Sequence, residues 1–448
     1  MSDRTRGFGR KFAATACIVA TSGLILTACS SDDDADTTSS ESTTAAEAAK
    51  DSGSGDTIEY WHRLPDNESA TKVNDIVAKW NADHPDKQVK ATKFEGNADD
   101  SYKKIGAAID AGTAPCLAQV SYSEMGQELV ADHLMDIKEY ADQYKDKYQP
   151  GAWGGVVLGD GVYGIPQDTG PLVYFYDKDA FEQLGIQPPK TWDDFAAAAE
   201  KAKAEGKYIG VFEPDEAGAM LSGLTAGNDG TWFSADGDQW KVDINGEKSK
   251  QVADFWQEML DKKLVANYER WGDDFKAALG NGEIIGTVGA GWEVSLIPDD
   301  LPEGAHWGVV QLPSFDGKQM TGPDGGSAIS VLKGCQDPKG ATEFANWFNT
   351  QIPELQTQGL LPAAKGDLKT PESLKKVYGE DNVYATIAEA NKNMNPDFIF
   401  SPTWAVVKKG IATDAGKVGS GTTLDQVLEN AQKTGVSSLK DKGISVKE

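Results

Sequence analysis

Residues 163–195 read YGIPQDTGPLVYFYDKDAFEQLGIQPPKTWDDF, and this stretch decides the fold. Within it, residues 171–177 (PLVYFYD) form a nearly continuous apolar run, which is typical of a strand covered on both faces. A helix is expected to begin at Thr191, because Thr191 and Asp194 have the spacing of a capping box. The same helix is expected to end at Gly206, since glycine suits a helix C-terminus. A buried strand followed by a clearly delimited helix indicates an α/β protein.

Strands and helices alternate on both sides of this stretch. Upstream, the pattern predicts strands near residues 57–63, 89–94 and 117–122, each followed by a helix, at 68–84, 101–111 and from Glu124. Downstream, strands are expected at 208–212 and 282–292, with an amphipathic helix at 249–260 between them. Such alternation predicts parallel sheets with helices on both faces, and ligands bound at the carboxyl ends of the strands.

The N-terminal 55 residues have a different composition. Four basic residues within positions 4–11 precede seventeen mostly apolar residues, which is the layout of a secretory signal. Leu26, Thr27 and Ala28 before Cys29 resemble the lipobox of bacterial lipoproteins, so we expect residues 1–28 to be a lipoprotein signal peptide and Cys29 to carry lipid. An ordinary signal peptide or an uncleaved membrane span are the alternatives. Residues 29–55 contain no aromatic or large aliphatic side chain and are expected to form a disordered acidic tether.

Length and charge limit the function classes. The part from about residue 57 to 448 is longer than one hydrophobic core usually serves, which indicates two lobes. The formal charge of −27 argues against nucleic acid as a partner. Cys116 and Cys335 are the only cysteines after Cys29, and in an exported protein we expect them to form a disulfide, the alternative being two separately buried thiols.

Several motifs resemble one known family. The stretch 163–195, together with GTVGAGWEVSLI (286–297), GPDGGSAISV (322–331) and NMNPDFIFSPTWAVV (393–407), is similar to extracellular solute-binding proteins of the carbohydrate type, the capture subunits of bacterial ABC importers. The resemblance implies a two-lobed, periplasmic-binding-protein-like α/β fold with a three-crossing hinge. It places the first lobe at residues 56–168 plus 328–362 and the second at 171–325 plus 366–448, with crossings near 168–172, 322–328 and 361–365. Both cysteines then fall in the first lobe.

The resemblance also implies a function. We expect a monomeric, lipid-anchored substrate-binding subunit on the extracellular face of a Gram-positive-type cell membrane. It would capture a di- or oligosaccharide by hinge closure and deliver it to the transmembrane permease, without a cofactor.

Candidate ligand-binding residues follow from the chemistry of sugars, which need aromatic platforms and polar partners for hydroxyls. Trp61 and Trp292 lie at the ends of predicted strands, and Trp404 occupies a position where the family has a ring-stacking aromatic; packing at the lobe interface is the alternative for each. Asp168 at the first crossing could accept from hydroxyls or bind backbone amides of the hinge. The remaining candidates lie in the contact loop after the third strand and at the second crossing: Ser121, Tyr122, Glu124 and Gly326. Helix capping and a plain turn are their alternatives.

The arginines keep a second ligand class open. Only Arg63 and Arg270 follow Cys29, the first two positions from Trp61 and the second beside Trp271. If both point into the cleft, their planar forks suit an anionic solute such as a sugar phosphate or a uronic-acid oligomer. Chance placement near aromatics is the alternative.

An enzyme is the remote alternative, because carboxylates beside aromatics also describe a glycosidase. The sequence singles out no such acid pair, no nucleophile elbow, no phosphate-binding glycine loop and no H-E-x-x-H motif. The four histidines are dispersed, so we predict no metal site and no catalytic residue.

Overall fold

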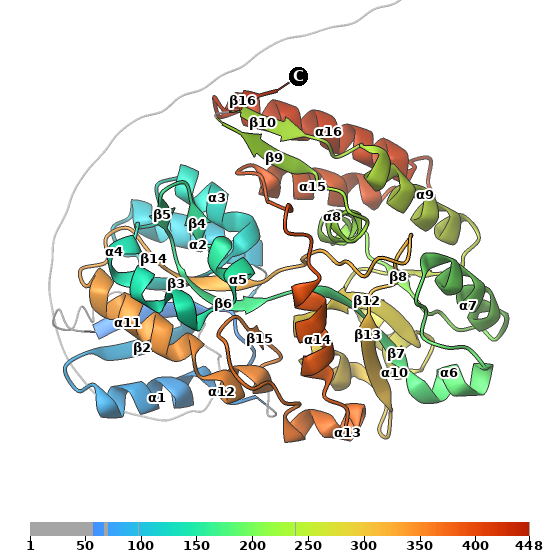
Figure 1. Ribbon diagram of the computed structural model, residues 1–448, viewed down its shortest axis with the longest axis horizontal. Helices are drawn as coiled ribbons and strands as arrows, with labels where there is room; N and C mark the ends of the chain where they lie inside the picture. Colours follow the sequence, from blue (N-terminus) through green and yellow to red (C-terminus); the bar gives the residue numbers. More distant parts are fainter. Residues whose placement is uncertain (1–56, 67–69, 97, 238, 448) are drawn as a thin grey trace, which may run out of the picture. The chain divides into compact units, whose positions relative to one another are not determined.

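The computed structural model describes residues 57–66, 70–96, 98–237 and 239–447 (Figure 1). The predicted leader, Cys29 and the predicted tether lie outside these residues. Within the described residues, no helix combines the length and apolar character that a membrane crossing requires. The elements gather around two main sheets, which define a first and a second lobe.

The first lobe contains a six-stranded sheet in the order β15-β6-β14-β3-β1-β2. Strand β1 runs parallel to β2 and β3, whereas β14 is antiparallel to β3 and β6, and β15 is antiparallel to β6. The strands are β1 (Thr57–His62), β2 (Gln88–Lys93), β3 (Leu117–Ser121), β6 (Ile165–Thr169), β14 (Ser327–Val331) and β15 (Leu361–Pro362). The sheet is therefore assembled from two separated parts of the chain, residues 57–169 and 327–362.

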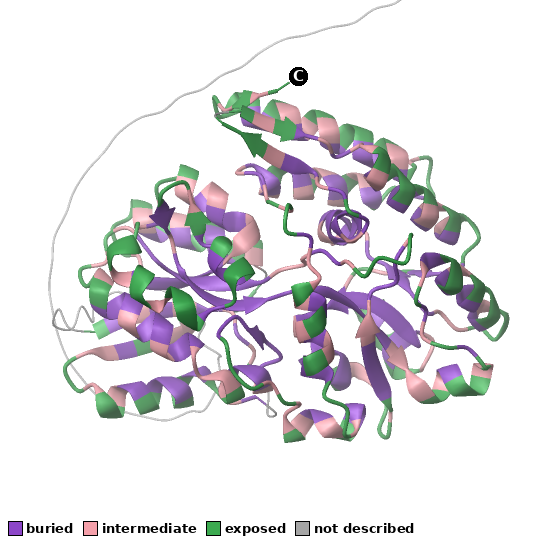
Figure 2. Ribbon diagram, viewed as in Figure 1, coloured by how far each residue is buried: buried purple, intermediate pink, exposed green. Residues whose placement is uncertain are grey.

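Helices pack around this sheet and bury its apolar side chains in one core, which includes Tyr60, Trp80 and Phe344. The first-lobe helices are α1 (Val73–Asp83), α2 (Ala98–Asp110), α3 (Tyr122–Val130), α4 (Lys138–Ala141), η1 (Asp142–Lys147), α5 (Pro150–Gly154), α11 (Pro338–Asn349) and α12 (Ile352–Thr357), with a small ribbon of β4 (Val157–Leu158) and β5 (Gly161–Val162). Figure 2 shows the central strands β3, β6 and β14 mostly buried and the outer sides of the helices exposed.

The second lobe differs from the expected parallel arrangement. Its main sheet has the order β12-β7-β13, and β7 (Leu172–Asp177) is antiparallel to both β12 (Gly286–Ala290) and β13 (Trp307–Gln311). The partners of β7 come from more than 100 residues further along the chain, so the strand–helix alternation beside β7 did not reveal them. Smaller sheets are β8 (Val211–Phe212) with β11 (Ala266–Asn267), and β9 (Phe233–Asp236) with β10 (Gln239–Val242) and β16 (Ser445–Val446).

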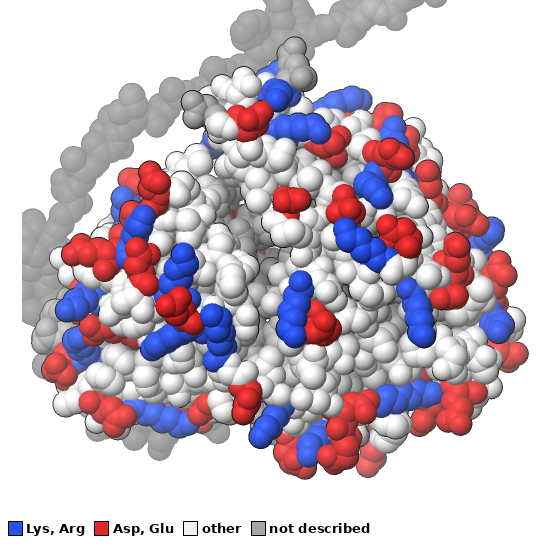
Figure 3. All heavy atoms as spheres, in the orientation of Figure 1, with Lys and Arg blue, Asp and Glu red and all other residues white. Residues whose placement is uncertain are grey.

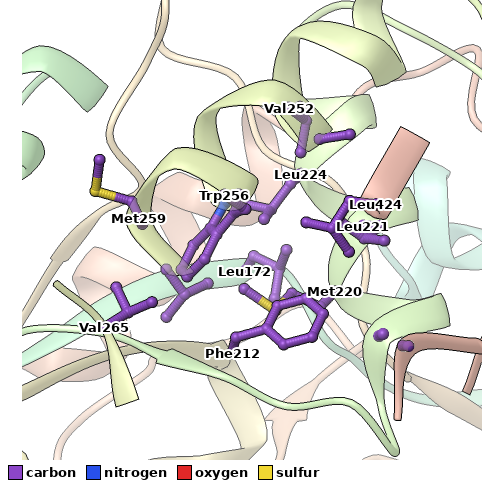
Figure 4. Packing of buried hydrophobic residues seen from close by; sticks show 14 of the residues in the cluster. Leu172, Phe212, Met220, Leu221, Leu224, Val252, Trp256, Met259, Val265 and Leu424 are labelled. Carbon is purple, nitrogen blue, oxygen red and sulfur yellow. The ribbon is translucent and has the colours of Figure 1, made fainter. Parts of the chain in front are cut away.

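The helices of the second lobe enclose two apolar clusters. One of them surrounds Trp256 with Leu172, Phe212 and Met220, side chains that come from strands and helices far apart in the sequence (Figure 4). The helices are α6 (Lys178–Leu184), α7 (Trp192–Ala204), α8 (Ala217–Gly227), α9 (Glu247–Asp261), α10 (Asp273–Gly280), η2 (Gly291–Ser295), η3 (Ile297–Asp300), η4 (Glu372–Leu374), α13 (Lys375–Tyr378), α14 (Val383–Lys392), α15 (Trp404–Ala415) and α16 (Leu424–Asp441).

The stretch 163–195 forms the structure that its pattern predicts. The apolar run becomes β7, whose first four residues are buried. The Thr191 side chain accepts from the Asp194 backbone N–H, and the Asp194 carboxylate accepts from the Thr191 N–H, each at 3.1 Å. Helix α7 ends at Ala204, and Gly206 beyond it has φ of +72°.

Two chain crossings between the sheets lie side by side. Strand β6 of the first sheet leads through Gly170 and Pro171 into β7 of the second. The Asp324 backbone N–H donates to the Gly170 carbonyl at 2.7 Å, and the Leu172 N–H donates to the Gly322 carbonyl at 2.9 Å. Strand β15 pairs with β6 at Asp168 and Thr169 and so brings a third segment to the same place. The exact bounds of the two lobes stay a prediction.

Cys116 and Cys335 lie at disulfide distance, with their Cα atoms 4.5 Å apart. The reason is the pairing of β3 with β14, in which Leu117 faces Val331. The backbone N–H of Leu332 donates to the Cys116 carbonyl, so the two strand ends hold the cysteines together.

Candidate functional site

A cavity of about 480 Å³ lies where the strands of the first sheet end. Its walls come from the loops after β1 and β2, from the end of β3, from the crossings and from η2 of the second lobe. The lining residues with polar or aromatic side chains are Arg63, Lys93, Phe94, Glu95, Gln119, Ser121, Asp168, Trp292, Ser295, Ser327 and Gln358. Residues from both lobes therefore face one space, at the strand ends expected from the sequence.

Asp168 is the buried carboxylate of this cavity. It is the last but one residue of β6, next to the hinge, and is 4% exposed. The Ser327 hydroxyl donates to its Oδ1 at 2.6 Å. Burial raises the pKa of Asp168 to about 6, while the hydrogen bonds from Ser327 and the charge of Arg63 lower it. The second oxygen of such a carboxylate is suited to accept a hydrogen bond from a ligand hydroxyl.

Arg63 forms part of the first-lobe wall, but its donors are largely in use. Its Nη1 donates to the Ser101 hydroxyl and to the Gln119 carbonyl, both at 3.0 Å. Its Nη2 donates to the hydroxyls of Tyr102 and Ser121, both at 3.2 Å. The guanidinium thus orders Ser121 and Gln119 beside the cavity instead of presenting an open fork to it.

Trp292 brings an aromatic ring to the cavity from the second lobe. The ring is held at its edge, because Nε1 donates to the Asp324 carbonyl at 2.9 Å. Gly325 allows this approach: its φ is +83°, and an added Cβ would lie only 2.9 Å from Trp292 Nε1. The site therefore combines an aromatic face, a buried carboxylate and several neutral hydrogen-bonding groups.

The comparisons with known proteins identify the family. Residues 65–351, more than half of the chain, match the model of the family described as bacterial extracellular solute-binding protein. The chain belongs to this family. The resemblance inferred from the motifs is thereby confirmed.

Solved structures of similar solute-binding proteins share the two-lobed fold. The galacto-N-biose/lacto-N-biose I-binding protein of the ABC transporter from Bifidobacterium longum is 45% identical, with a TM-score of 0.84 over 88% of this chain and all of that one. The ABC transporter associated binding protein from B. animalis subsp. lactis, in complex with β-1,6-galactobiose, is 25% identical, with a TM-score of 0.77 over the same shares.

A curated relative binds another kind of solute. The sn-glycerol-3-phosphate-binding periplasmic protein UgpB of Escherichia coli is 26% identical over 299 residues, which are 62% of this chain. The match spans 66% of the length of that relative.

Two other tryptophans predicted for the solute-binding site lie elsewhere. Trp404 is 2% exposed at the start of α15, and its ring packs against Trp232, Phe233 and Phe400. It does not line the cavity, which corrects the stacking role that the family resemblance implied: Trp404 begins a helix whose first residue packs in the core. Trp61 lies within β1 and does not line the cavity. Its Nε1 donates to Glu59 Oε1 at 3.2 Å, and Lys104 Nζ lies 4.5 Å from its ring centroid.

Arg270 and Trp271 also do not line the cavity. The Arg270 side chain is 6% exposed and forms ion pairs with Glu213 and Glu293. Trp271 packs against Phe275 at a ring-centroid distance of 5.2 Å. The expectation that Arg270 points into the cleft is therefore corrected, because buried carboxylates of its own lobe hold the guanidinium.

The contact loop after β3 is divided between three environments. Ser121 lines the cavity. Tyr122 packs its ring against Gly326, whose φ of +84° and lack of a Cβ let the hinge approach. Glu124 is 3% exposed, and its nearest cation is Lys408 of α15, 4.0 Å away.

Sequence reasoning missed several lining residues. Gln119 had a signal, since it is the one polar side chain within the buried run of β3. Ser327 and Gln358 had none, because their positions depend on the pairing of β14 and on the end of α12.

Proposed function

We propose that this solute-binding protein captures a neutral di- or oligosaccharide in the cavity between its lobes and delivers it to the permease of an ABC importer. Ligand contacts from both lobes would stabilise a closed state, as in hinge closure of periplasmic binding proteins. A lipid at Cys29 would hold the protein at the extracellular face of the membrane as a monomer. The solute-binding proteins solved with lacto-N-biose and β-1,6-galactobiose support this proposal.

The observation that carries the proposal is the pairing of the Trp292 ring with the carboxylate of Asp168 across one cavity. A sugar ring has an apolar face that suits an aromatic platform and hydroxyls that suit carboxylate, amide and hydroxyl partners. The volume of about 480 Å³ lies in the usual range for small-molecule sites. Gln119, Ser121, Ser327 and Gln358 supply the neutral polar partners.

An anionic solute is the second candidate, and the similarity to the sn-glycerol-3-phosphate-binding protein favours it. Lys93 and Arg63 do line the cavity, but Glu95 and Asp168 line it too. The N–H groups of Arg63 already bind neutral acceptors of the protein. These contacts support a neutral ligand.

The experiment is a thermal-shift and calorimetric screen of the purified protein with lacto-N-biose, β-1,6-galactobiose, maltose and sn-glycerol-3-phosphate. A ligand that binds only the native state raises its stability by RT ln(1 + [L]/Kd), so a micromolar ligand at millimolar concentration is easily detected. Binding of a neutral saccharide is the expected result. A response to sn-glycerol-3-phosphate alone would overturn the proposal, and release of free sugar from a bound saccharide would instead show an enzyme.

A further inference from the structure

Three strand ends of the second lobe bring one cation and two acids together. Glu213 follows β8, Arg270 lies three residues after β11, and Glu293 lies in η2 directly after β12. Their side chains are 3%, 6% and 1% exposed. None of the three lines the cavity. This cluster, called here the arginine clamp, is therefore a buried feature behind the site.

Arg270 is fixed at both ends of its fork. Nη1 pairs with Glu213 and Nη2 pairs with Glu293. The backbone N–H of Arg270 donates to Asp215 Oδ1 at 2.9 Å. Glu293 is held in turn, because its Oε1 accepts from the Ala290 N–H at 2.5 Å. Buried ion pairs add little net stability compared with apolar packing, so the clamp suggests a role in placing neighbouring groups.

The neighbouring group that reaches the ligand cavity is Trp292. The guanidinium carbon of Arg270 lies 5.7 Å from the centroid of the Trp292 ring, within cation–π distance. Glu293 is the next residue in the chain, so the clamp also fixes the backbone that carries the ring. Together with the hydrogen bond from Nε1 to Asp324, this leaves the ring little freedom to rotate.

We propose that Arg270 is a positioning residue for solute binding, which holds the Trp292 ring in its stacking orientation through the clamp with Glu213 and Glu293 and does not touch the ligand. The inference rests on the proposed saccharide function. Arg270 then has a role even though the ligand is neutral. A Trp292 ring that is already ordered loses less conformational entropy when the ligand binds.

The first test needs no ligand. Protein labelled with 5-fluorotryptophan is compared with Arg270→Gln by ¹⁹F NMR, and the Trp292 signal is assigned with Trp292→Phe. Arg270→Gln should shift or broaden the Trp292 signal, while Lys276→Gln, which removes an exposed cation of α10, should leave it unchanged. An unchanged Trp292 signal in folded Arg270→Gln would overturn the inference.

The second test is a double-mutant cycle with the saccharide that the wild-type protein binds, measured by calorimetry. In the wild-type background, Arg270→Gln should weaken saccharide binding about five- to tenfold. In a Trp292→Ala background the same substitution should weaken binding less than about twofold, because the effects of two residues that act through one contact are not additive. Equal losses in both backgrounds would contradict action through the ring. If Arg270→Gln does not fold, Arg270→Lys, which keeps the charge, is measured in the same double-mutant cycle with Trp292→Ala.

The two tests separate this inference from the proposed function. A wild-type protein that binds no neutral saccharide refutes the function, and the ¹⁹F comparison still decides whether Arg270 orders Trp292. A loss that is larger for sn-glycerol-3-phosphate than for saccharides, and that persists without Trp292, would show direct contact between Arg270 and an anionic ligand.

Discussion

At the scale of single residues, the same side-chain type serves opposite purposes in this protein. Trp292 lines the cavity, whereas Trp404 packs among aromatic rings in the second-lobe core. Both follow glycine- or proline-containing segments, and their sequences alone gave equal reasons to expect ligand contact. Burial separates them, and substitution should do so as well.

Trp292→Ala should weaken saccharide binding by about 30-fold or more, as for a central aromatic contact, with little effect on stability. Trp404→Ala should lower the free energy of unfolding by about 3–5 kcal/mol, because it leaves a cavity in the core, while the folded fraction keeps its affinity. Denaturation and calorimetry on both variants check this pair. If Trp404→Ala weakened binding and Trp292→Ala lowered only the stability, Trp404 would be the residue that stacks on the sugar.

The pH dependence of binding should report the carboxylate of Asp168. Its pKa of about 6 means that acidification below pH 6 replaces an acceptor with a protonated acid, so the affinity for a neutral saccharide should fall. The contribution of Asp168 to folding has the opposite sign: its folded pKa lies above the usual value, so this contribution is lost as the pH rises through 6. Calorimetry between pH 5 and pH 8 is the measurement.

The control is Asp168→Asn, which keeps the shape of the side chain. It should bind more weakly than the wild-type protein at pH 8 and show a flat profile across the same range. A wild-type profile that is also flat would mean that Asp168 does not accept from the ligand.

At the scale of elements, the sequence signals for single helices and strands were reliable. The pairing of strands into sheets could not be predicted from such signals. The capping box of α7 and the apolar run of β7 appear as predicted, because both depend on neighbours within a few residues. The antiparallel partners of β7 depend on segments around residues 286–290 and 307–311. The helix that begins at Trp404 was not predicted.

The pairing of β3 with β14 holds Cys116 and Cys335 together, and a disulfide between them should stabilise the folded protein. Replacing both cysteines with serine should lower the free energy of unfolding by about 2–4 kcal/mol, because the cross-link restricts the unfolded chain. Saccharide affinity should not change, since neither cysteine lines the cavity. Denaturation of the wild-type protein with and without reductant, beside the double variant, checks this; identical stabilities would show two free thiols.

At the scale of the whole molecule, the chain has a formal charge of −27. Figure 3 shows acidic and basic side chains interspersed over the visible face. A lysine of the second lobe contacts acids of the first. Lys408 of α15 lies 3.1 Å from Asp99 and 4.0 Å from Glu124 of the first lobe. Helix α3 also approaches the segment that leads into α15: a Cβ added to Gly126 would lie only 3.3 Å from Pro402 Cα.

These contacts join the lobes beside the cavity, so they should favour the closed state. Lys408→Ala should weaken saccharide binding by about three- to tenfold without touching the ligand, since a ligand must then supply more of the closing free energy. Lys409→Ala, which removes the exposed neighbouring cation, is the matched control and should bind normally. Small-angle scattering of the ligand-free variants should show a larger radius of gyration for Lys408→Ala only; equal radii and affinities would contradict the role.

The sequence by itself determined the family, the α/β class, the two-lobed fold and the ends of the best-marked elements, because these follow from periodicity, capping and motifs that neighbouring residues carry. It also pointed to Asp168, at the first crossing, and to Trp292, just after a strand. Only the tertiary structure decided which side chains share the cavity, which tryptophans are core, and that Arg270 faces Glu213 and Glu293. The physical reason is that the first sheet is assembled from two segments separated by the second lobe, so its cavity joins residues whose proximity no local pattern encodes.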